Sequence, residues 1–280
     1  MSARRRALAG LLLAGLLAPS PARAQESCSR VVVYTLPGIT WQHIARYEPP
    51  EILAAVEEGA AGSVSVRTNS PRTSYASGFA TLGAGTRVDG GDTTGGSIEP
   101  SAGMALGDLF ATDVQVAGLS ELRDLAERAG YNALPGALAT ALGDIPVTAV
   151  GNADLAVPVP VGARPGRWTL LAAMDSTGVV DRAAVDTSLV TIGPEGVPRT
   201  DPTAFDAAID DALGEDCWVT FVDHGDLTRA DQIPLIPGGT IDEGRAVALA
   251  AADAALGDVR DRLDPERDLL IVVSPTSPLH

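Results

Sequence analysis

The sequence predicts an α/β fold in which a mostly parallel sheet carries helices on both faces. Three apolar runs, at 31–34, 218–222 and 269–273, show little polar alternation, which is typical of strands buried on both faces. Segments with helix-capping signals lie between these runs, so strands and helices alternate along the chain. This order favours a parallel sheet whose crossover helices pack on it.

The first apolar run is followed by helical segments and a further strand. A helical stretch begins near Thr40, is interrupted at Pro49-Pro50 and resumes over 51–59, because proline fits the first turn of a helix but not its interior. The segment 63–67 alternates polar and apolar residues, which predicts a strand.

Two further helices are indicated by their end signals. Thr73 or Ser74 can cap a short helix that ends near residue 82, since both side chains can accept a hydrogen bond from the first turn. Ser120 is predicted to cap an amphipathic helix that Gly130 closes.

The second half of the chain continues the alternation. A short strand is predicted over 146–150, a helix after Asp201, and a long helix from the capping signal at 240–243 to about residue 263. The segment 158–201 is rich in proline, glycine and short strand-like pieces, so we interpret it as an insertion or edge region.

The N-terminus has the three zones of a secretory signal peptide. Arg4–Arg6 precede the apolar run 7–17, and Ala-Arg-Ala at 22–24 offers small residues at the two positions that signal peptidase reads. We therefore expect residues 1–24 to be removed and residues 25–280 to fold outside the cytoplasm as one α/β domain. An uncleaved membrane anchor is the alternative, although a spanning helix needs about 20 apolar residues.

Composition narrows the classes of partner. The formal net charge of −16 argues against nucleic acid and against anionic lipid surfaces, because both need clustered basic residues. Hydrophobic residues make up 45% of the chain, so a sizeable core is expected.

The chain has two cysteines, Cys28 and Cys217, and an even count in an exported protein favours a disulfide. Each precedes a predicted strand, so the two lie at one edge of the sheet if those strands are parallel neighbours. Strands about 4.8 Å apart suit the Cα separation that a disulfide accepts. Two buried free thiols are the alternative.

The last apolar run, 269–273, has the composition of a central strand, yet only residues 274–280 follow it. A doubly wound domain normally covers such a strand with a further crossover helix. We therefore expect the sequence to be an N-terminal fragment of a longer protein.

In open α/β sheets, sites form where strands reach their carboxyl ends. The turns that qualify are Leu36-Pro37-Gly38, Thr73-Ser74-Tyr75, Asp223-His224-Gly225-Asp226 and Ser274-Pro275-Thr276. Their order resembles the alkaline phosphatase-like superfamily of phosphatases, sulfatases and phosphomutases. In that family, acidic and histidine ligands follow these strands and hold two metal ions, while a Thr or Ser at the start of a helix is the nucleophile.

The chain departs from the family pattern at the ligand positions. Pro37 stands where the first Asp ligand is expected, and Pro275 and Thr276 stand where Asp and His follow Ser274. Proline has no side-chain donor for a cation. The resemblance therefore implies a degenerate, exported bacterial branch in which the two-metal site is lost and a similar domain precedes a membrane-embedded region.

Two groups of residues are candidates for chemistry. Thr73 or Ser74 can act as a nucleophile at a helix N-terminus, but an ordinary N-cap is the preferred interpretation. Asp223, His224 and Asp226 can together bind one divalent cation, but a polar turn is preferred, because no further ligand is identifiable.

Two hypotheses of different class follow. The first is a non-catalytic, alkaline phosphatase-like domain, a pseudoenzyme that needs no cofactor and has an interaction or structural role at the cell envelope, with membrane association through a region after residue 280. The second is a metal-dependent hydrolase of phosphate or sulfate esters, with Ser74 or Thr73 as nucleophile and Asp223 and Asp226 on the metal. The sequence names no substrate or partner.

Overall fold

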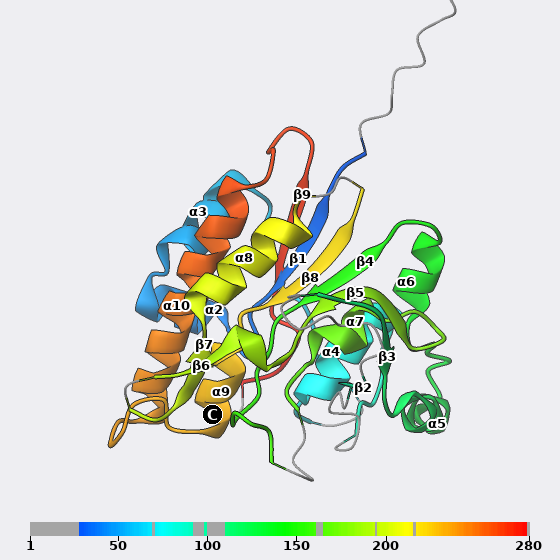
Figure 1. The fold of residues 1–280 in the computed structure, drawn as a ribbon, viewed down its shortest axis with the longest axis horizontal. Helices are drawn as coiled ribbons and strands as arrows, with labels where there is room; N and C mark the ends of the chain where they lie inside the picture. Colours follow the sequence, from blue (N-terminus) through cyan, green and yellow to red (C-terminus); the bar gives the residue numbers. More distant parts are fainter. Residues whose placement is uncertain are drawn as a thin grey trace, which may run out of the picture.

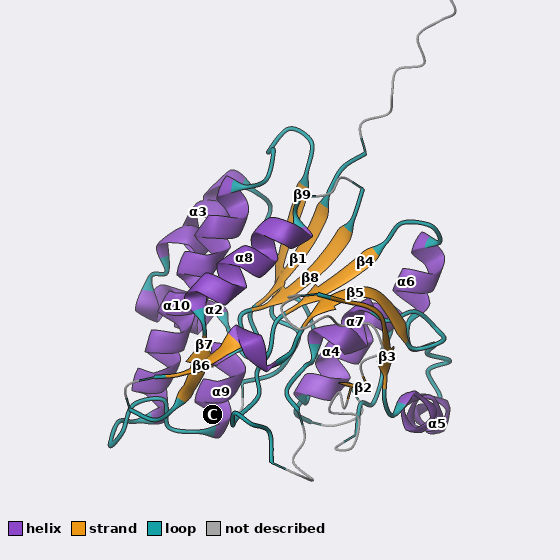
Figure 2. Ribbon diagram, in the orientation of Figure 1, coloured by secondary structure: helices purple, strands orange, loops and turns teal. Residues whose placement is uncertain are grey.

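The computed structural model confirms an α/β fold built on a mostly parallel sheet (Figures 1 and 2). It describes residues 28–68, 71–91, 98–99, 110–160, 165–193, 195–214 and 217–278. Five adjacent strands, β5, β4, β8, β1 and β9, run parallel, whereas β3 is antiparallel to β5 and the two-residue β2 is antiparallel to β3. In spatial order the strands are β2 (Ile98–Glu99), β3 (Ala111–Val116), β5 (Val179–Ala184), β4 (Val147–Val150), β8 (Val219–Asp223), β1 (Val31–Thr35) and β9 (Leu269–Val273).

Helices cover both faces of the sheet. One face packs against α4 (Tyr75–Ala84), α5 (Leu119–Ala129), α6 (Ala137–Leu142) and α7 (Thr169–Ala173). The other packs against α3 (Pro50–Glu58), α8 (Pro202–Ala212), α9 (Asp226–Gln232) and α10 (Ile241–Asp261), while α2 (Trp41–Tyr47) precedes α3. The 3₁₀ turn η2 (Thr187–Leu189) leads into a separate hairpin of β6 (Val190–Ile192) and β7 (Pro198–Thr200).

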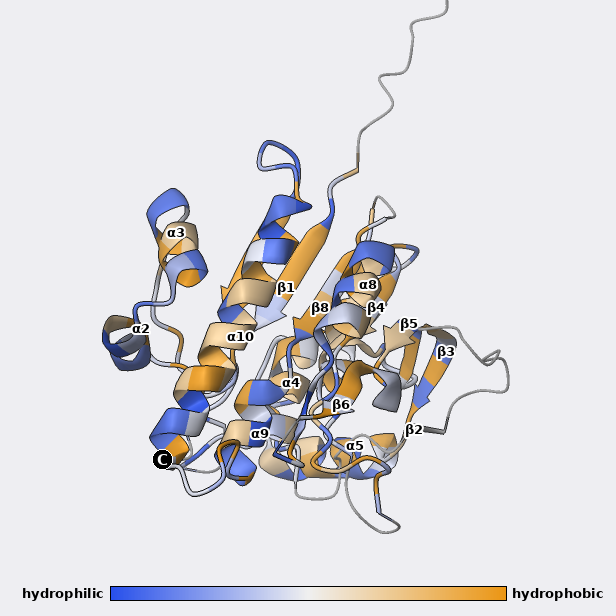
Figure 3. Cartoon of the chain, turned by 60° about the vertical axis from the view of Figure 1, so that its left-hand side comes forward, coloured by the Kyte–Doolittle hydropathy of each residue, from blue (hydrophilic) through white to orange (hydrophobic). Residues whose placement is uncertain are grey.

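The central strands are apolar on both faces, as the sequence predicts. In β1, Val32 and Tyr34 pack on the α8–α10 side, while Val33 packs on the α4–α7 side. Figure 3 shows β1 and β8 in the hydrophobic colour along most of their length. Two cores, one on each face, therefore clamp the strands that carry the carboxyl-edge loops.

Most predicted helix ends are confirmed. Thr240 and Glu243 form a reciprocal capping box at the start of α10, and the Asp201 side chain caps α8. The predicted Ser120 cap is wrong, since α5 begins after Gly118 in the left-handed conformation, which places Ser120 inside the first turn.

The Cys28–Cys217 disulfide is present, with a Cα separation of 4.9 Å. Its position follows from the sheet, because β1 and β8 are parallel neighbours in which Val31 lies opposite Val219. Both cysteines precede their strands, so the bond ties the amino ends of two central strands together.

Of two sequence predictions about strands, one is wrong and the other is confirmed. The segment 63–67 forms no strand; its Val64 side chain is 71% exposed, so the segment has neither the burial nor the backbone partner that a strand requires. The last strand, β9, stands at the end of the sheet next to β1, and its Leu269 and Ile271 are 52% and 41% exposed. The predicted strand is therefore confirmed, and it stands at one end of the sheet that the described residues form.

The segment predicted as an insertion or edge region, 158–201, has two parts. Its β5 lies inside the sheet between β4 and β3, and its β6–β7 hairpin lies outside it. The predicted signal peptide, residues 1–24, is outside the described residues. Among the residues that are described, no helix has the length and apolar character to cross a bilayer.

Candidate functional site

The loops after β1, β4, β8 and β9 meet at the carboxyl edge of the sheet, where α/β proteins place their sites. Glycines let these loops approach closely. Gly151, with φ +130°, has the carbonyl oxygen of Asp223 only 2.0 Å from where a Cβ would lie, and Gly225 is as close to the Asn152 carbonyl, at 2.2 Å. No other residue fits at these two positions, so the loops after β4 and β8 are held backbone to backbone.

A buried arginine fills the space between these loops. Arg229 on α9 is fully buried, and its Nη1 donates to Asp226 Oδ1 at 2.5 Å and to Thr200 Oγ1 at 3.0 Å. Its Nε donates to the Asp154 carbonyl at 3.0 Å, and its Nη2 to the Asn152 carbonyl at 2.5 Å. These four hydrogen bonds hold the guanidinium in place, and its charge neutralises Asp226.

The acceptors on the β4 loop are held by a second set of bonds. Asn152 Nδ2 donates to the carbonyls of Val185 and Asp186, at 2.9 and 2.8 Å. Asp154 accepts from Asn152 Nδ2 at 3.0 Å and from the Gly166 amide at 2.7 Å. The polar groups around Arg229 are therefore fixed before any ligand arrives.

Asp223, the last residue of β8, is buried, with its carboxylate accepting from the Gly225 amide at 3.2 Å. Burial raises the pKa of Asp223 to about 7, although the Gly225 amide and the nearby Arg229 charge act in the opposite direction. Asp223 can therefore exchange a proton near neutral pH.

His224 follows directly and lies in an apolar setting. Its ring meets Phe205 edge to face, with centroids 5.2 Å apart, and its Nδ1 is 3.8 Å from Asp226 Oδ2. Burial lowers the pKa of His224, so the imidazole is neutral at pH 7. Nδ1 has no hydrogen-bond partner within the described structure.

A second buried arginine holds a second carboxylate nearby. Arg245 on α10 pairs with Asp231 on α9, and Asp231 Oδ2 also accepts from the Tyr75 hydroxyl at 2.7 Å. Burial and the neighbouring Asp231 raise the pKa of Tyr75 well above its ordinary range. Arg245 also contacts His43 Nε2 at 3.3 Å, which links α2 to this network.

Both candidate nucleophiles are engaged in local structure. Ser74 is the N-cap of α4: its Oγ accepts from the Ser77 amide at 3.2 Å and donates to Ser77 Oγ at 3.0 Å. Thr73 is 1% exposed and its hydroxyl donates to the Val66 carbonyl. Of the two, only Ser74 is partly accessible.

The prolines that stand at the family's ligand positions have packing roles. Pro37 is buried in the turn after β1. The Pro275 carbonyl lies only 2.4 Å from where a Cβ on Gly78 would be, so the loop after β9 rests directly on α4. Helix α4 can come this close only because Gly78 has no side chain.

The end of β8 does bring together Asp223, His224 and Asp226. The two carboxylates, however, already have different partners within the protein. Asp226 is ion-paired with Arg229, and Asp223 bonds to the Gly225 amide. In the part of the chain that the structure describes, no three His, Cys, Asp or Glu side chains are grouped so that they could hold a metal ion.

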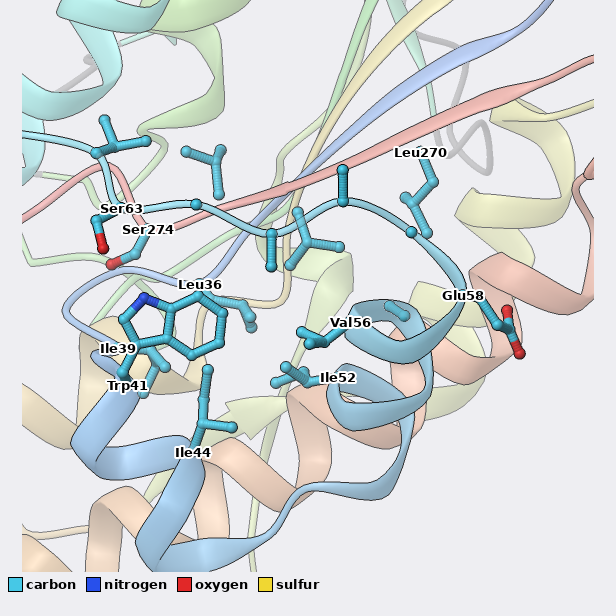
Figure 4. Close-up of a pocket in the computed structure, with 18 of the residues that line it drawn as sticks. Leu36, Ile39, Trp41, Ile44, Ile52, Val56, Glu58, Ser63, Leu270 and Ser274 are labelled. Atoms are coloured by element: carbon cyan, nitrogen blue, oxygen red, sulfur yellow. The ribbon is translucent and has the colours of Figure 1, made fainter.

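A separate apolar groove of about 700 Å³ lies beside β9. We call it the β9 groove. Figure 4 shows Trp41 and Ile44 of α2 and Ile52 and Val56 of α3 reaching into it, opposite Leu270. The segment 63–67, with Ser63 labelled in the figure, runs along its outer side, so it forms a wall of this groove instead of the predicted strand.

Comparisons of this chain with protein-family models, with curated proteins and with solved structures found no match. The geometry is therefore the main guide to function. Sequence reasoning selected Asp223, His224 and Asp226 but missed Arg229, although Asp226 and Arg229 have the i,i+3 spacing of a helical ion pair. Asn152 and Thr200 come from distant segments, and no motif around them in the sequence indicated that they contact Arg229.

Proposed function

We propose that this protein is an exported, non-catalytic domain of alkaline phosphatase-like type, with an interaction or structural role at the bacterial cell envelope. The observation that carries the proposal is the buried Arg229, whose guanidinium holds Asp226 at 2.5 Å between the loops of the carboxyl edge. A fixed positive charge on this carboxylate competes with any divalent cation for the same oxygens.

The second arginine supports the same reasoning. Arg245 neutralises Asp231 beside the turn that contains Pro37, so Asp226 and Asp231 each have a guanidinium partner, while Asp223 accepts a hydrogen bond from the Gly225 amide. Phosphate and sulfate ester hydrolysis by this superfamily relies on two metal ions to stabilise charge and activate the nucleophile. Carboxylates that are paired with arginine are less available to metal ions, which favours a role other than hydrolysis.

An interaction role is supported by the β9 groove. A concave apolar surface of about 700 Å³ falls in the size range of ligand sites. Export is supported by the signal-peptide pattern of residues 1–24 and by the disulfide, which forms and persists in oxidising compartments.

Hydrolysis is the second candidate, and two observations favour it. Ser74 presents a partly accessible hydroxyl at the N-terminus of α4, and burial gives Asp223 a pKa of about 7. In this alternative, Ser74 attacks the ester and Asp223 and Asp226 hold one metal ion.

One experiment separates the two candidates. The purified chain is assayed with 4-nitrophenyl phosphate and 4-nitrophenyl sulfate in the presence of Mg²⁺, Mn²⁺ or Zn²⁺, beside Ser74→Ala, Thr73→Val and Asp223→Ala. We expect no turnover above the level of the variants, and no stoichiometric metal by elemental analysis. Turnover that Ser74→Ala and Asp223→Ala both abolish would establish the hydrolase instead.

A further inference from the structure

A second groove lies between α8 and α10, above the end of β8, and we call it the α8–α10 groove. Its volume is about 390 Å³, within the range of sites for small molecules. Apolar side chains of α8 and α10 form much of its lining, His224 and Asp226 lie at the end of β8, and the other polar residues of the lining are Arg199, Thr200, Asp206 and Asp258. The residues used in the argument are Phe205 and Ile209 of α8, Val247 and Ala251 of α10, and His224 and Asp226 at the inner end.

His224 supplies an unpartnered polar atom to this groove. Its side chain is only 8% exposed, and its Nδ1 has no hydrogen-bond partner among the described residues. The ring is held edge to face by Phe205, so the position of Nδ1 is fixed. A buried polar nitrogen without a partner costs free energy, which a bound group with the right chemistry would recover.

The second polar atom is Asp226 Oδ2, which faces His224 Nδ1 at 3.8 Å, beyond hydrogen-bond distance. An oxygen beside the line that joins these two atoms can lie within hydrogen-bond distance of both. A hydroxyl suits the pair, because it can accept from an Nδ1–H and donate to Oδ2 at the same time. Neither a carbonyl nor an ether oxygen can donate a hydrogen bond, so either group would leave Asp226 Oδ2 without a donor.

The charges around the groove favour a neutral ligand. Asp226 is already paired with Arg229, and Asp206 at the rim is paired with Arg262 at 2.6 Å. The lining also includes Arg199 and Asp258, which carry opposite charges, so the groove as a whole offers no net charge to compensate the desolvation of a charged ligand.

We propose that the α8–α10 groove is a binding site for a small neutral alcohol or phenol. The hydroxyl of this ligand accepts a hydrogen bond from His224 Nδ1 and donates one to Asp226 Oδ2. The apolar part of the ligand lies against Phe205 and the small side chains of α10. This site is independent of the proposed function, since it requires neither catalysis at Ser74 nor occupancy of the β9 groove.

The test compares two probes that differ by one hydroxyl. The purified chain is titrated with 4-methylphenol and with toluene at pH 7.5, followed by ¹H–¹⁵N chemical shifts. We expect 4-methylphenol to bind roughly tenfold more tightly than toluene, about the value of one good hydrogen bond. The largest shifts should come from residues of α8, α10 and the end of β8.

Two variants and a matched control make the test specific. His224→Phe keeps an aromatic ring against Phe205 but removes Nδ1, so the preference for the hydroxyl should disappear. Ala251→Leu fills the groove without touching the polar pair and should weaken both probes. Ala250→Leu, the same change on the exposed side of α10, should leave both affinities unchanged.

Several results would overturn the proposal. Equal affinities for the two probes, or no binding of either, would mean that an ordered water alone satisfies His224. Binding that survives Ala251→Leu would place the probe elsewhere on the molecule. A hydroxyl preference that is lost on adding EDTA would show that a metal ion, and not the imidazole–carboxylate pair, recognises the ligand.

Discussion

The buried carboxyl of Asp223 makes the stability of this protein depend on pH in an unusual direction. Burial raises the pKa of Asp223 from its ordinary value of 3.8 to about 7, so the folded state holds a proton that the unfolded state has released. Between these two pH values, the folded state binds more protons than the unfolded state. Its free energy of unfolding therefore falls as the pH rises from about 4 to about 7, and the fall ends above pH 7.

The size of the effect follows from the shift. About three pKa units, at about 1.4 kcal/mol each, give a contribution of about 4 kcal/mol that is present at pH 4 and absent at pH 8. Asp223→Asn removes the titration while its side-chain oxygen still accepts from the Gly225 amide. We expect the variant to match the parent near pH 4 and to be more stable by up to about 4 kcal/mol at pH 8.

Urea unfolding of parent and variant at pH 4, 5, 6, 7 and 8 measures this directly. The difference between the two proteins matters, because other titrating groups contribute equally to both. At pH 8 the midpoint of thermal unfolding should rise by roughly 10 °C for a domain of this size. Asp144→Asn, at an exposed carboxylate, should give a difference close to zero at every pH. A constant difference between parent and Asp223→Asn across this range would refute the reasoning.

Three further perturbations test other parts of the structure by urea unfolding. Arg229→Met leaves Asp226 buried without its cation and should lower the free energy of unfolding by about 3–5 kcal/mol. The control, Arg46→Gln, breaks an exposed pair with Asp242 and should lower it by less than about 1 kcal/mol. Equal losses in the two variants would contradict the role given to Arg229. Replacing both Cys28 and Cys217 by Ser removes a link between residues 189 apart and should lower the free energy of unfolding by up to about 5 kcal/mol. An unchanged free energy of unfolding, compared with the oxidised parent, would show that the disulfide does not stabilise the fold. Gly78→Ala forces a methyl group against the Pro275 carbonyl and should cost about 1–3 kcal/mol, while Gly62→Ala, which meets nothing within 4 Å, should be nearly neutral; a neutral Gly78→Ala would mean that α4 is not packed on this loop.

The sequence predicted the central strands of the sheet better than the segments at and beyond its edge. The strands β1 and β8 are buried on both faces, so their apolar runs were sufficient evidence. The run of β9 looks the same, but its position depends on which strand lies beyond it, and no local pattern records that. The segment 63–67 alternates as a strand should, yet strand formation also needs a free backbone partner, which comes from tertiary structure.

The candidate site was predicted in part for a similar reason. Asp223, His224 and Asp226 could be read as a polar cluster because one turn after one strand carries all three. Their chemistry is set by Arg229, which is inside the next helix, and by Phe205 on α8. Such partners fix a carboxylate's charge and an imidazole's surroundings, and they become visible only when the chain is folded.

The placement of β1 in the sheet has a consequence for how the chain reaches its native state. Its two neighbours, β8 and β9, come from the last quarter of the sequence, and the disulfide spans 189 residues. During synthesis, the first strand to emerge therefore has no partner strand until residues 219–223 have been made. Assembly with such distant contacts is slow, and an apolar segment waiting so long is exposed to aggregation. These 280 residues contain two cysteines, however, so only one disulfide can form among them and no wrong pairing competes with it there.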